Sequence, residues 1–256
     1  MFAPRQDPQA LQALQAEIAH LRAELATAKA ATDRPHFVSD YTAYVRWLIE
    51  THPLDAAMAF AVGGGDFDQT GRLMVGVLRK CGLHEGMSLV DLGCGSGRLA
   101  KHLGLNFPDM DYLGIDIVQE LLDYAATLSP AHFRFKLNHS LTLPAPDGSA
   151  DMVVAFSVFT HLLHQESYCY LEEAKRVLRP GGRVVFSFLE SPSNGPIFDG
   201  MVSRARAGQK DDQLNMFTER VQLEAWAAQL DMEVLGYDFG TPHTGNGQTV
   251  TVFRRS

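Results

Sequence analysis

The chain has 256 residues, of which 46% are hydrophobic and 20% are charged. This balance, with a mean hydropathy of −0.08, is typical of a folded globular protein and argues against wholesale disorder. The 30 acidic residues outnumber the 22 basic ones and give a net charge of −8, whereas a nucleic-acid-binding protein normally carries a positive field. We therefore expect no nucleic-acid partner.

The sequence shows no signal for a membrane or for an oxidising compartment. Its longest apolar stretch, near Met152–Phe159, is far shorter than the ~20 residues that cross a bilayer, and residues 1–30 contain no apolar targeting segment. The three cysteines, Cys81, Cys94 and Cys169, have neither disulfide-framework nor zinc-ligand spacing. We expect a cytoplasmic protein that holds no metal and does not associate with a membrane.

Residues 1–33 predict a helix with a narrow apolar seam. Apolar residues recur at alternating spacings of three and four along this segment: Leu11, Leu14, Ile18, Leu21 and Leu25. An isolated helix of this length is marginal in water, so residues 8–30 are predicted to pair, coiled-coil fashion, with a second copy or a partner protein. The alternatives are that the seam packs on its own domain or that the segment is a frayed arm.

Residues 34–84 predict a helical lead-in. Two short helices are expected between residues 37 and 60, separated at His52-Pro53, and a third over 71–81 that ends at Gly82. The first carries Tyr41, Tyr44 and Trp47, which either line a pocket or anchor the helix.

From residue 85 onwards, strand patterns alternate with helix patterns. Strands are expected at 88–92, 112–117, 132–137, 150–156 and 183–188, with helices at 98–105, 119–128 and 167–178 between them. A helix at 218–230 and strands at 233–239 and 248–254 then close the edge as an antiparallel pair. The pattern predicts a doubly wound α/β fold with a mostly parallel seven-stranded sheet and an antiparallel last strand, preceded by a helical extension.

A glycine-rich loop follows the first strand. Gly93, Gly95 and Gly97 allow a tight turn and close approach of a ligand at a helix N-terminus. Asp116 ends the next strand, where an acid accepts hydrogen bonds from ribose hydroxyls. A dinucleotide is disfavoured, because Arg98 stands where its third glycine belongs and Asp91 would face the pyrophosphate. S-adenosylmethionine has no phosphate and carries positive charge, so an acid beside the loop suits it.

Four segments resemble the class I S-adenosylmethionine-dependent methyltransferases, of the general bacterial type that acts on small molecules. They are VDLGCGSGRLA (90–100), YLGIDI (112–117), LPAPDGSADMVVAFSVFTHL (143–162) and EEAKRVLRPGGRVVFSF (172–188), in the family's order. The resemblance spans residues 85–190, so residues 85–256 are predicted to form the S-adenosylmethionine-binding domain, with an insert at about 190–217 on the acceptor side.

The resemblance implies S-adenosyl-L-methionine as the cofactor and assigns residues to it. The first motif supplies Asp91, Gly93, Cys94, Gly95 and Gly97 around the methionine part; Asp116 contacts the ribose and Ile117 the adenine. Asn138, His139 and Ser140 stand where related sequences often carry an acid that touches the adenine amine, and either Asn138 or His139 substitutes for it. Phe156 falls where the family's chain passes under the cofactor.

Two histidines follow the fourth strand, at the rim where ligands bind in such sheets. Methyl transfer needs mainly alignment and exclusion of water, but a hydroxyl acceptor gains from a base. A spacing of three predicts that His161 and His164 share one face of a helix. His161 is the first candidate for the general base and His164 a weaker one; the alternative is that His161 packs or caps a turn and His164 faces solvent.

The predicted activity is transfer of a methyl group to an oxygen, or less favourably a nitrogen, of a small molecule such as a metabolite, sugar or natural product. A lid is expected at 191–196, where proline and glycine punctuate the chain. No Pro-Pro-aromatic motif of the amino-methylating DNA enzymes follows the fourth strand. Two alternatives remain open: a non-catalytic S-adenosylmethionine-binding subunit recruited by its coiled coil, and a protein methyltransferase.

Overall fold

In the computed structural model, the chain divides into two units, residues 1–34 and residues 35–256. The structure describes residues 17, 20, 38–209, 214–237 and 247–256. The seam residues predicted to form the coiled coil lie outside the described residues. Of the first unit only Glu17 and His20 are described, both helical and exposed.

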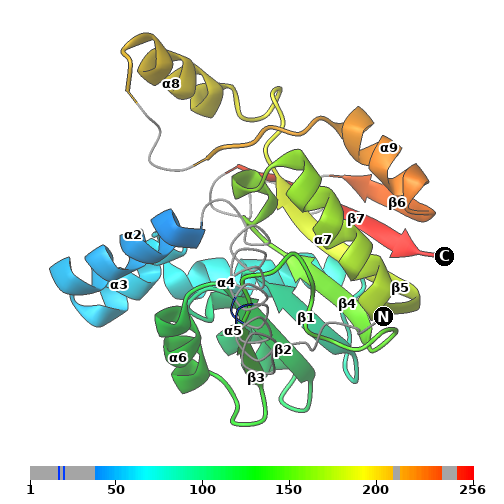
Figure 1. Cartoon of the computed structure of the whole chain (residues 1–256). Coiled ribbons are helices and arrows are strands. Elements are labelled where there is room, and N and C mark those ends of the chain that lie inside the picture. The colour runs from blue at the N-terminus through cyan, green and yellow to red at the C-terminus, as the bar shows by residue number, and fades with distance from the viewer. Residues whose placement is uncertain (1–16, 18–19, 21–37, 210–213, 238–246) are drawn as a thin grey trace, which may run out of the picture. The chain divides into compact units, whose positions relative to one another are not determined.

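The second unit is built on one sheet whose strands run in the order β3-β2-β1-β4-β5-β7-β6 (Figure 1). The strands are β1 (Ser88–Leu92), β2 (Asp111–Asp116), β3 (Arg134–Leu137), β4 (Ala150–Ala155), β5 (Leu178–Phe188), β6 (Met232–Tyr237) and β7 (Thr249–Arg255). The first five are parallel, and β7 is antiparallel to both β5 and β6. This confirms the predicted mostly parallel, seven-stranded sheet. The strand order reverses between β1 and β4, and ligands of such sheets bind at the carboxyl ends of the strands at that point.

Helices cover both faces of this sheet (Figure 1). They are α2 (Val38–Thr51), α3 (Leu54–Ala61), α4 (Phe67–Lys80), α5 (Arg98–Asn106), α6 (Gln119–Leu128), the 3₁₀ turn η1 (Phe159–His161), α7 (His164–Val177), α8 (Gly195–Arg206) and α9 (Arg220–Gln229). None of the helices in the described part of the chain has the length and apolarity that a bilayer crossing needs.

Three apolar clusters hold these helices in place. Leu171 of α7 and Trp226 of α9 pack on one face of the sheet, and Leu78 of α4 and Leu103 of α5 pack on the other. A smaller cluster joins α2 and α3 to Leu121 of α6. The two N-terminal helices are therefore fixed near the carboxyl ends of β1 and β2, where α6 begins.

The structure differs from the expected elements between residues 160 and 206. The fifth strand is predicted at 183–188, but β5 begins at Leu178 and includes Pro180-Gly181-Gly182, where its register against β4 shifts. The lid expected at 191–196 leads into α8, which the sequence analysis missed. Gly195 and Pro196 looked like breakers, yet proline is well tolerated in the first turn of a helix, and Pro196 stands there.

Candidate active site

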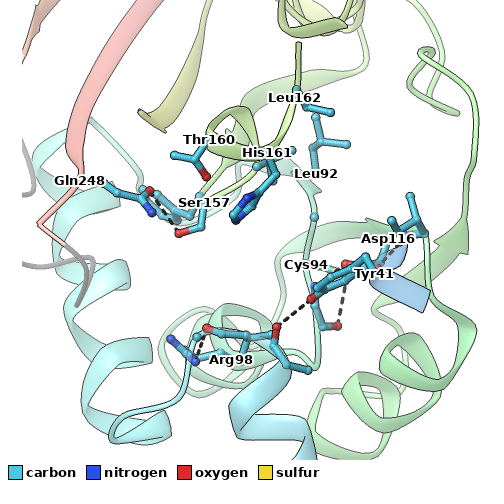
Figure 2. Close-up of a pocket in the computed structure, with 18 of the residues that line it drawn as sticks. Tyr41, Leu92, Cys94, Arg98, Asp116, Ser157, Thr160, His161, Leu162 and Gln248 are labelled. Carbon is cyan, nitrogen blue, oxygen red and sulfur yellow. Dashed lines mark hydrogen bonds between the residues drawn. The ribbon is translucent and has the colours of Figure 1, made fainter. Parts of the chain in front are cut away.

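A cavity of about 730 Å³ lies at the carboxyl ends of the central strands (Figure 2). Its walls include Asp91 and Leu92 at the end of β1, Asp116 at the end of β2, and the segment 156–158 after β4. This is the position that the strand order predicts, and the volume is in the range of small-molecule sites.

The loop between β1 and α5 forms one end of the cavity. Gly93, Gly95 and Gly97 all have positive φ, at 71°, 56° and 84°, a conformation that L-residues with side chains rarely adopt. The loop also packs too closely for side chains: a Cβ on Gly93 would lie 2.4 Å from Val158 Cγ2, and one on Gly95 would lie 2.4 Å from Val62 Cγ1. The glycines therefore make a cradle of backbone that a ligand can approach closely.

Asp116 lies beside this cradle and is tied to it. Its carboxylate accepts hydrogen bonds from the backbone N–H of Gly95 (2.9 Å), Ile117 (2.8 Å) and Val118 (3.1 Å). Burial raises the pKa of Asp116 to about 6, although these three N–H groups favour the ionised form. A carboxylate has about four acceptor positions, so Asp116 retains the capacity to bind a ligand hydroxyl.

Asp91 adds a second buried carboxylate to the same end. It is 3% exposed, and the Tyr112 hydroxyl donates to its Oδ2 at 2.7 Å. Burial raises the pKa of Asp91 to about 7, with a further upward contribution from Asp116. Two buried carboxylates in one cavity wall favour a ligand that carries positive charge, because ionising them without one is costly.

Arg98 fixes the neighbouring wall. It is 7% exposed, and its guanidinium donates to the carbonyls of Val62 (2.6 Å) and Gly64 (3.2 Å). Its Nε has no hydrogen-bond partner among the described residues, and no carboxylate there pairs with it. The side chain is therefore neither solvated nor, within the described part of the chain, paired with an acid; it ties the loop after α3 to the N-terminus of α5.

The N-terminal helices close the cavity over this end. Tyr41 of α2 donates from its hydroxyl to the carbonyl of Ala61 at 2.8 Å, and its ring lies beside Asp116 and Cys94 (Figure 2). Burial raises the pKa of Tyr41 far above its usual range. Tyr41 and Tyr44 both line the cavity, whereas Trp47 is 52% exposed and does not. Tyr41 thus fulfils both of the alternatives considered for the aromatic residues of this helix: it lines the pocket and it anchors the helix.

His161 lies at the opposite end of the cavity, on η1. Its Nδ1 is 2.7 Å from the carbonyl oxygen of Leu214. A carbonyl oxygen only accepts, so Nδ1 carries the hydrogen, and in the neutral ring Nε2 is the nitrogen with the lone pair. Figure 2 shows the ring reaching into the cavity between Ser157 and Leu92.

His164 is placed differently. It begins α7, its Nε2 contacts the carbonyl of Phe217 at 3.0 Å, and its ring meets Trp226 edge to face at 5.6 Å. It does not line the cavity. The prediction that both histidines share one helical face is wrong, because Leu162 and Leu163 have extended backbone between η1 and α7.

Neutral polar groups surround His161. The Ser187 hydroxyl donates to Gln248 Oε1 at 2.6 Å and accepts from the backbone N–H of Ser157 at 2.7 Å. Ser157 has a positive φ of 56°, and its hydroxyl also donates to Gln248 Oε1 at 3.2 Å. No motif in the sequence marks Gln248 as a residue of this site, because it lies about ninety residues beyond Ser157, just before β7.

The structure brings most of the residues assigned to the cofactor to one cavity. Those that line it are Asp91, Gly93, Cys94, Gly95, Asp116, Ile117, Asn138 and Phe156. Gly97, His139 and Ser140 do not line it: Gly97 packs on Ala125, and His139 Nε2 contacts the Ile117 carbonyl at 2.9 Å. Of the two candidates for the adenine amine, Asn138 is therefore the one that faces the cavity.

Comparison with known proteins identifies the domain that carries this site. Residues 90–186 match a family described as a methyltransferase domain. This segment is similar to the S-adenosylmethionine-dependent methyltransferases. Demethylmenaquinone methyltransferase of Deinococcus radiodurans is 32% identical over 115 residues, which cover 44% of this chain and 47% of that protein. The 27-O-demethylrifamycin SV methyltransferase of Amycolatopsis mediterranei is 33% identical over 117 residues, covering 43% and 42%. The chain thus spans less than half the length of these curated relatives.

Solved structures agree on the methyltransferase fold. Geranyl diphosphate C-methyltransferase from Streptomyces coelicolor A3(2), determined with Mg²⁺, a geranyl thiolodiphosphate and S-adenosyl-L-homocysteine, aligns with a TM-score of 0.55 at 14% identity, over 73% of this chain and 76% of that one. At this identity the likeness concerns the fold. In the described part of this chain, no group of three or more metal-ligating side chains lies together.

The described residues fit S-adenosylmethionine. The glycine cradle leaves no space for side chains, Asp116 has acceptor capacity for a ribose, and the buried carboxylates of Asp91 and Asp116 suit a cationic ligand. Ile117 and Asn138 are placed along the same wall.

Proposed function

We propose that this protein transfers the methyl group of S-adenosylmethionine to a hydroxyl oxygen of a small molecule, with His161 as the general base. The observation that carries this proposal is the hydrogen bond from His161 Nδ1 to the Leu214 carbonyl. It holds the ring in the tautomer whose Nε2 can accept a proton, in the wall of the cavity that also contains the glycine cradle.

Five described residues would hold the cofactor. Asp116 accepts from the ribose hydroxyls, Ile117 and Asn138 contact the adenine, and Asp91 and the loop around Gly95 hold the methionine end. When bound, the cofactor supplies an electrophilic methyl group on a sulfonium. Tyr41, packed beside Asp116 and tied to α3, shields this end from water, which strengthens every polar contact inside.

The acceptor hydroxyl would lie between the cradle and η1. His161 Nε2 takes its proton, which makes the oxygen a better nucleophile, while the Leu214 carbonyl stabilises the imidazolium that forms by accepting from Nδ1. A nitrogen acceptor, which needs only to arrive neutral and aligned, is the less favoured version of the same reaction.

The substitution His161→Asn tests this assignment. An asparagine amide can still donate to the Leu214 carbonyl but supplies no base, so we expect kcat to fall by ~10²-fold with S-adenosylmethionine affinity unchanged. The probes are a panel of phenols and alcohols with labelled cofactor for transfer, and calorimetry for affinity. The acidic limb of the kcat pH profile should disappear in the variant.

The matched control is His164→Asn, because His164 stands outside the cavity. We expect its kcat to stay within about threefold of the parent, well below the ~10²-fold contribution of a general base. Equal losses of kcat in both variants, or a normal kcat in His161→Asn, would contradict a role of His161 as the general base. His161 would then have only a structural role, holding the segment around Leu214.

The shape of the cavity also bears on the alternatives. Its acceptor end has walls from α8 and from the segment around Leu214 as well as from the sheet, which favours a small molecule over a protein side chain and supports assigning residues 190–217 as the acceptor-side insert. We further infer a cytoplasmic enzyme in which 1–33 is an assembly helix, 34–84 a cap and 85–256 the methyltransferase domain. The assembly helix would bind a second copy or a partner protein through residues 8–30. If the domain binds the cofactor but transfers no methyl group, the alternative function is a non-catalytic subunit recruited by this helix.

A further inference from the structure

The acceptor end of the cavity has a composition of its own. Its apolar walls are Leu162, Leu189, Ile197, Met201 and Leu214, and its polar groups are the uncharged side chains of Ser157, Thr160, Asn215 and Gln248, together with His161. At the other end, two charged side chains of the lining, Asp91 and Asp116, are buried carboxylates. Arg98, the one Lys or Arg among the described residues that line the cavity, is engaged with the carbonyls of Val62 and Gly64.

Thr160 is an unusual member of this wall. Its side chain is buried at 1% exposure, and its Oγ1 has no hydrogen-bond partner among the described residues. Its backbone carbonyl accepts from the N–H of Met216 at 2.8 Å. A buried hydroxyl without a partner destabilises the free protein, so a polar group that bonds to it in the complex would offset that cost.

Thr160 and His161 are consecutive residues of η1, and both reach the same part of the cavity (Figure 2). A ligand hydroxyl placed there meets a hydroxyl that can donate or accept and an imidazole nitrogen that accepts. These are the partners of an uncharged hydroxyl rather than of an anion, which would need donors alone.

Helix α8 supplies a further apolar part of the same cavity wall. Ile197 and Met201 are four residues apart and hence on one side of the helix, and both line the cavity while remaining only half-buried. On the neighbouring side, Phe198 packs edge to face on Phe217 at 5.6 Å. The apolar surface of Ile197 and Met201 is complementary to an apolar body, and placing an anion against it would carry a desolvation penalty.

We propose that the acceptor is an uncharged molecule with a mainly apolar body, whose hydroxyl is bound by Thr160 beside His161 and whose body lies against Ile197 and Met201. This inference rests on the proposed function, because it names the substrate class of the same site. It adds Thr160 as an acceptor-binding residue and the inner side of α8 as the surface that selects against anions, reinforced by the carboxylates of Asp91 and Asp116.

The first test uses two acceptors with the same phenol, methyl 4-hydroxybenzoate and 4-hydroxybenzoate, with labelled S-adenosylmethionine; esterification removes the negative charge of the carboxylate. We expect kcat/KM for the ester to exceed that for the carboxylate by ~10-fold or more, since an unpaired charge in an apolar wall is costly. Met201→Arg should reverse the preference or bring the ratio close to one. Ser203→Arg, on an exposed position of the same helix, adds the same charge away from the cavity and should leave the ratio unchanged.

The second test removes the unpartnered hydroxyl. Thr160→Val keeps the shape of the side chain, and we expect KM for the ester to rise ~10-fold, consistent with one lost hydrogen bond, while the melting temperature stays equal or rises. Thr160→Ser restores a hydroxyl and should restore most of the KM. A valine variant with a normal KM, or one that loses stability along with activity and is not rescued by serine, would overturn the role of Thr160.

The outcomes separate this inference from the function on which it rests. If calorimetry shows no binding of S-adenosylmethionine, the proposed function fails. If the cofactor binds and a methyl group is transferred, but the carboxylate is preferred or Ser203→Arg shifts the ratio as far as Met201→Arg, the substrate class is wrong and the function stands. Bound cofactor with no transfer to any neutral phenol or alcohol of the panel also overturns the substrate class.

Discussion

The two ends of the cavity are built in different ways. The cofactor end consists of segments that each follow one strand: the loop 93–97 after β1 and Asp116 at the end of β2. Its contacts are largely to backbone, such as the three N–H groups that hold Asp116. The acceptor end gathers side chains from η1, α8, the segment around Leu214 and Gln248. This difference indicates that residues close together in the sequence can form the binding site for a common cofactor. The proposed acceptor site, in contrast, is assembled from residues that are far apart in the chain.

Adding one methyl group to the glycine cradle should give the largest loss of S-adenosylmethionine affinity. In Gly95→Ala the new Cβ would lie 2.4 Å from Val62 Cγ1, at a φ of 56°. We expect S-adenosylmethionine affinity to fall by ~100-fold, because the loop or the segment around Val62 must shift and the cradle cannot hold its shape. Calorimetry on the purified variant measures the effect.

Gly148→Ala is the matched control for that variant. Gly148 has a nearly identical φ of 60°, but nothing lies within 4 Å of the Cβ. Both variants carry the same backbone strain, about 1–3 kcal/mol, so both melting temperatures should fall, and that of Gly95→Ala should fall further because of its close approach to Val62. Only Gly95→Ala should lose the cofactor; equal affinities in the two variants would show that the close approach at Gly95 does not matter for binding.

A smaller, graded effect should follow from pH. Burial raises the pKa of Asp91 to about 7 and that of Asp116 to about 6 in the free protein. A cationic ligand favours the ionised carboxylates, so binding requires protons to leave, and affinity should fall by ~10-fold as the pH drops from about 7.5 to about 5.5. Titration calorimetry in buffers of different ionisation enthalpy would detect the released protons.

The same shifts have the opposite consequence for the stability of the free protein. Because both carboxylates have raised pKa values in the folded state, the folded protein holds more protons than the unfolded chain between about pH 4 and 7. Their contribution to stability is therefore present below the unfolded pKa and is lost as the pH rises through about 6 to 7.

The variant Asp116→Asn is the control for the pH dependence of cofactor binding. Its cofactor affinity should be lower by ~10-fold or more, and that affinity should depend less on pH. An Asp116→Asn protein with unchanged affinity would contradict the assignment of Asp116 to the ribose.

The smallest effect on the cavity is expected from deleting residues 1–34, the first unit of the chain. Cofactor affinity should stay within about twofold, because the described residues that line the cavity all belong to the second unit. If the apolar seam pairs two copies, as such heptads do, the molar mass measured by light scattering should halve. A deletion that abolishes cofactor binding would show that the extension belongs to the site.

Much of the fold could be predicted from the sequence because the central strands are largely buried and appear in the sequence as short apolar runs. β1 begins and ends where the apolar run 88–92 predicts, and α6 matches the predicted range 119–128. The predicted boundaries of helices and strands were wrong where a residue type occurs in two kinds of structure. Pro196 opens α8 although proline usually ends a helix, and Pro180-Gly181-Gly182 lies within β5 although these residues usually form turns.

The candidate site divides in the same way. Asp91, Gly95 and Asp116 could be assigned because their chemistry depends on a local conformation, a tight turn from strand to helix, that glycine spacing reveals. The relation of His161 to His164 was misjudged, since a spacing of three does not tell whether the helix begins before or after the first histidine. Thr160, Ile197, Met201 and Gln248 carry no pattern that marks them as lining a common cavity.

The sequence by itself thus determined the class of fold and predicted the cofactor, because both rest on short periodicities and motifs that are local in the chain. Only the tertiary structure decided which nitrogen of His161 carries the hydrogen, that Arg98 holds a loop instead of facing solvent, and that Thr160 and the inner side of α8 line the same cavity. The physical reason is that tautomer, burial and cavity shape depend on contacts between residues far apart in the chain, such as His161 with Leu214, and these contacts form only when the sheet and its helices have packed.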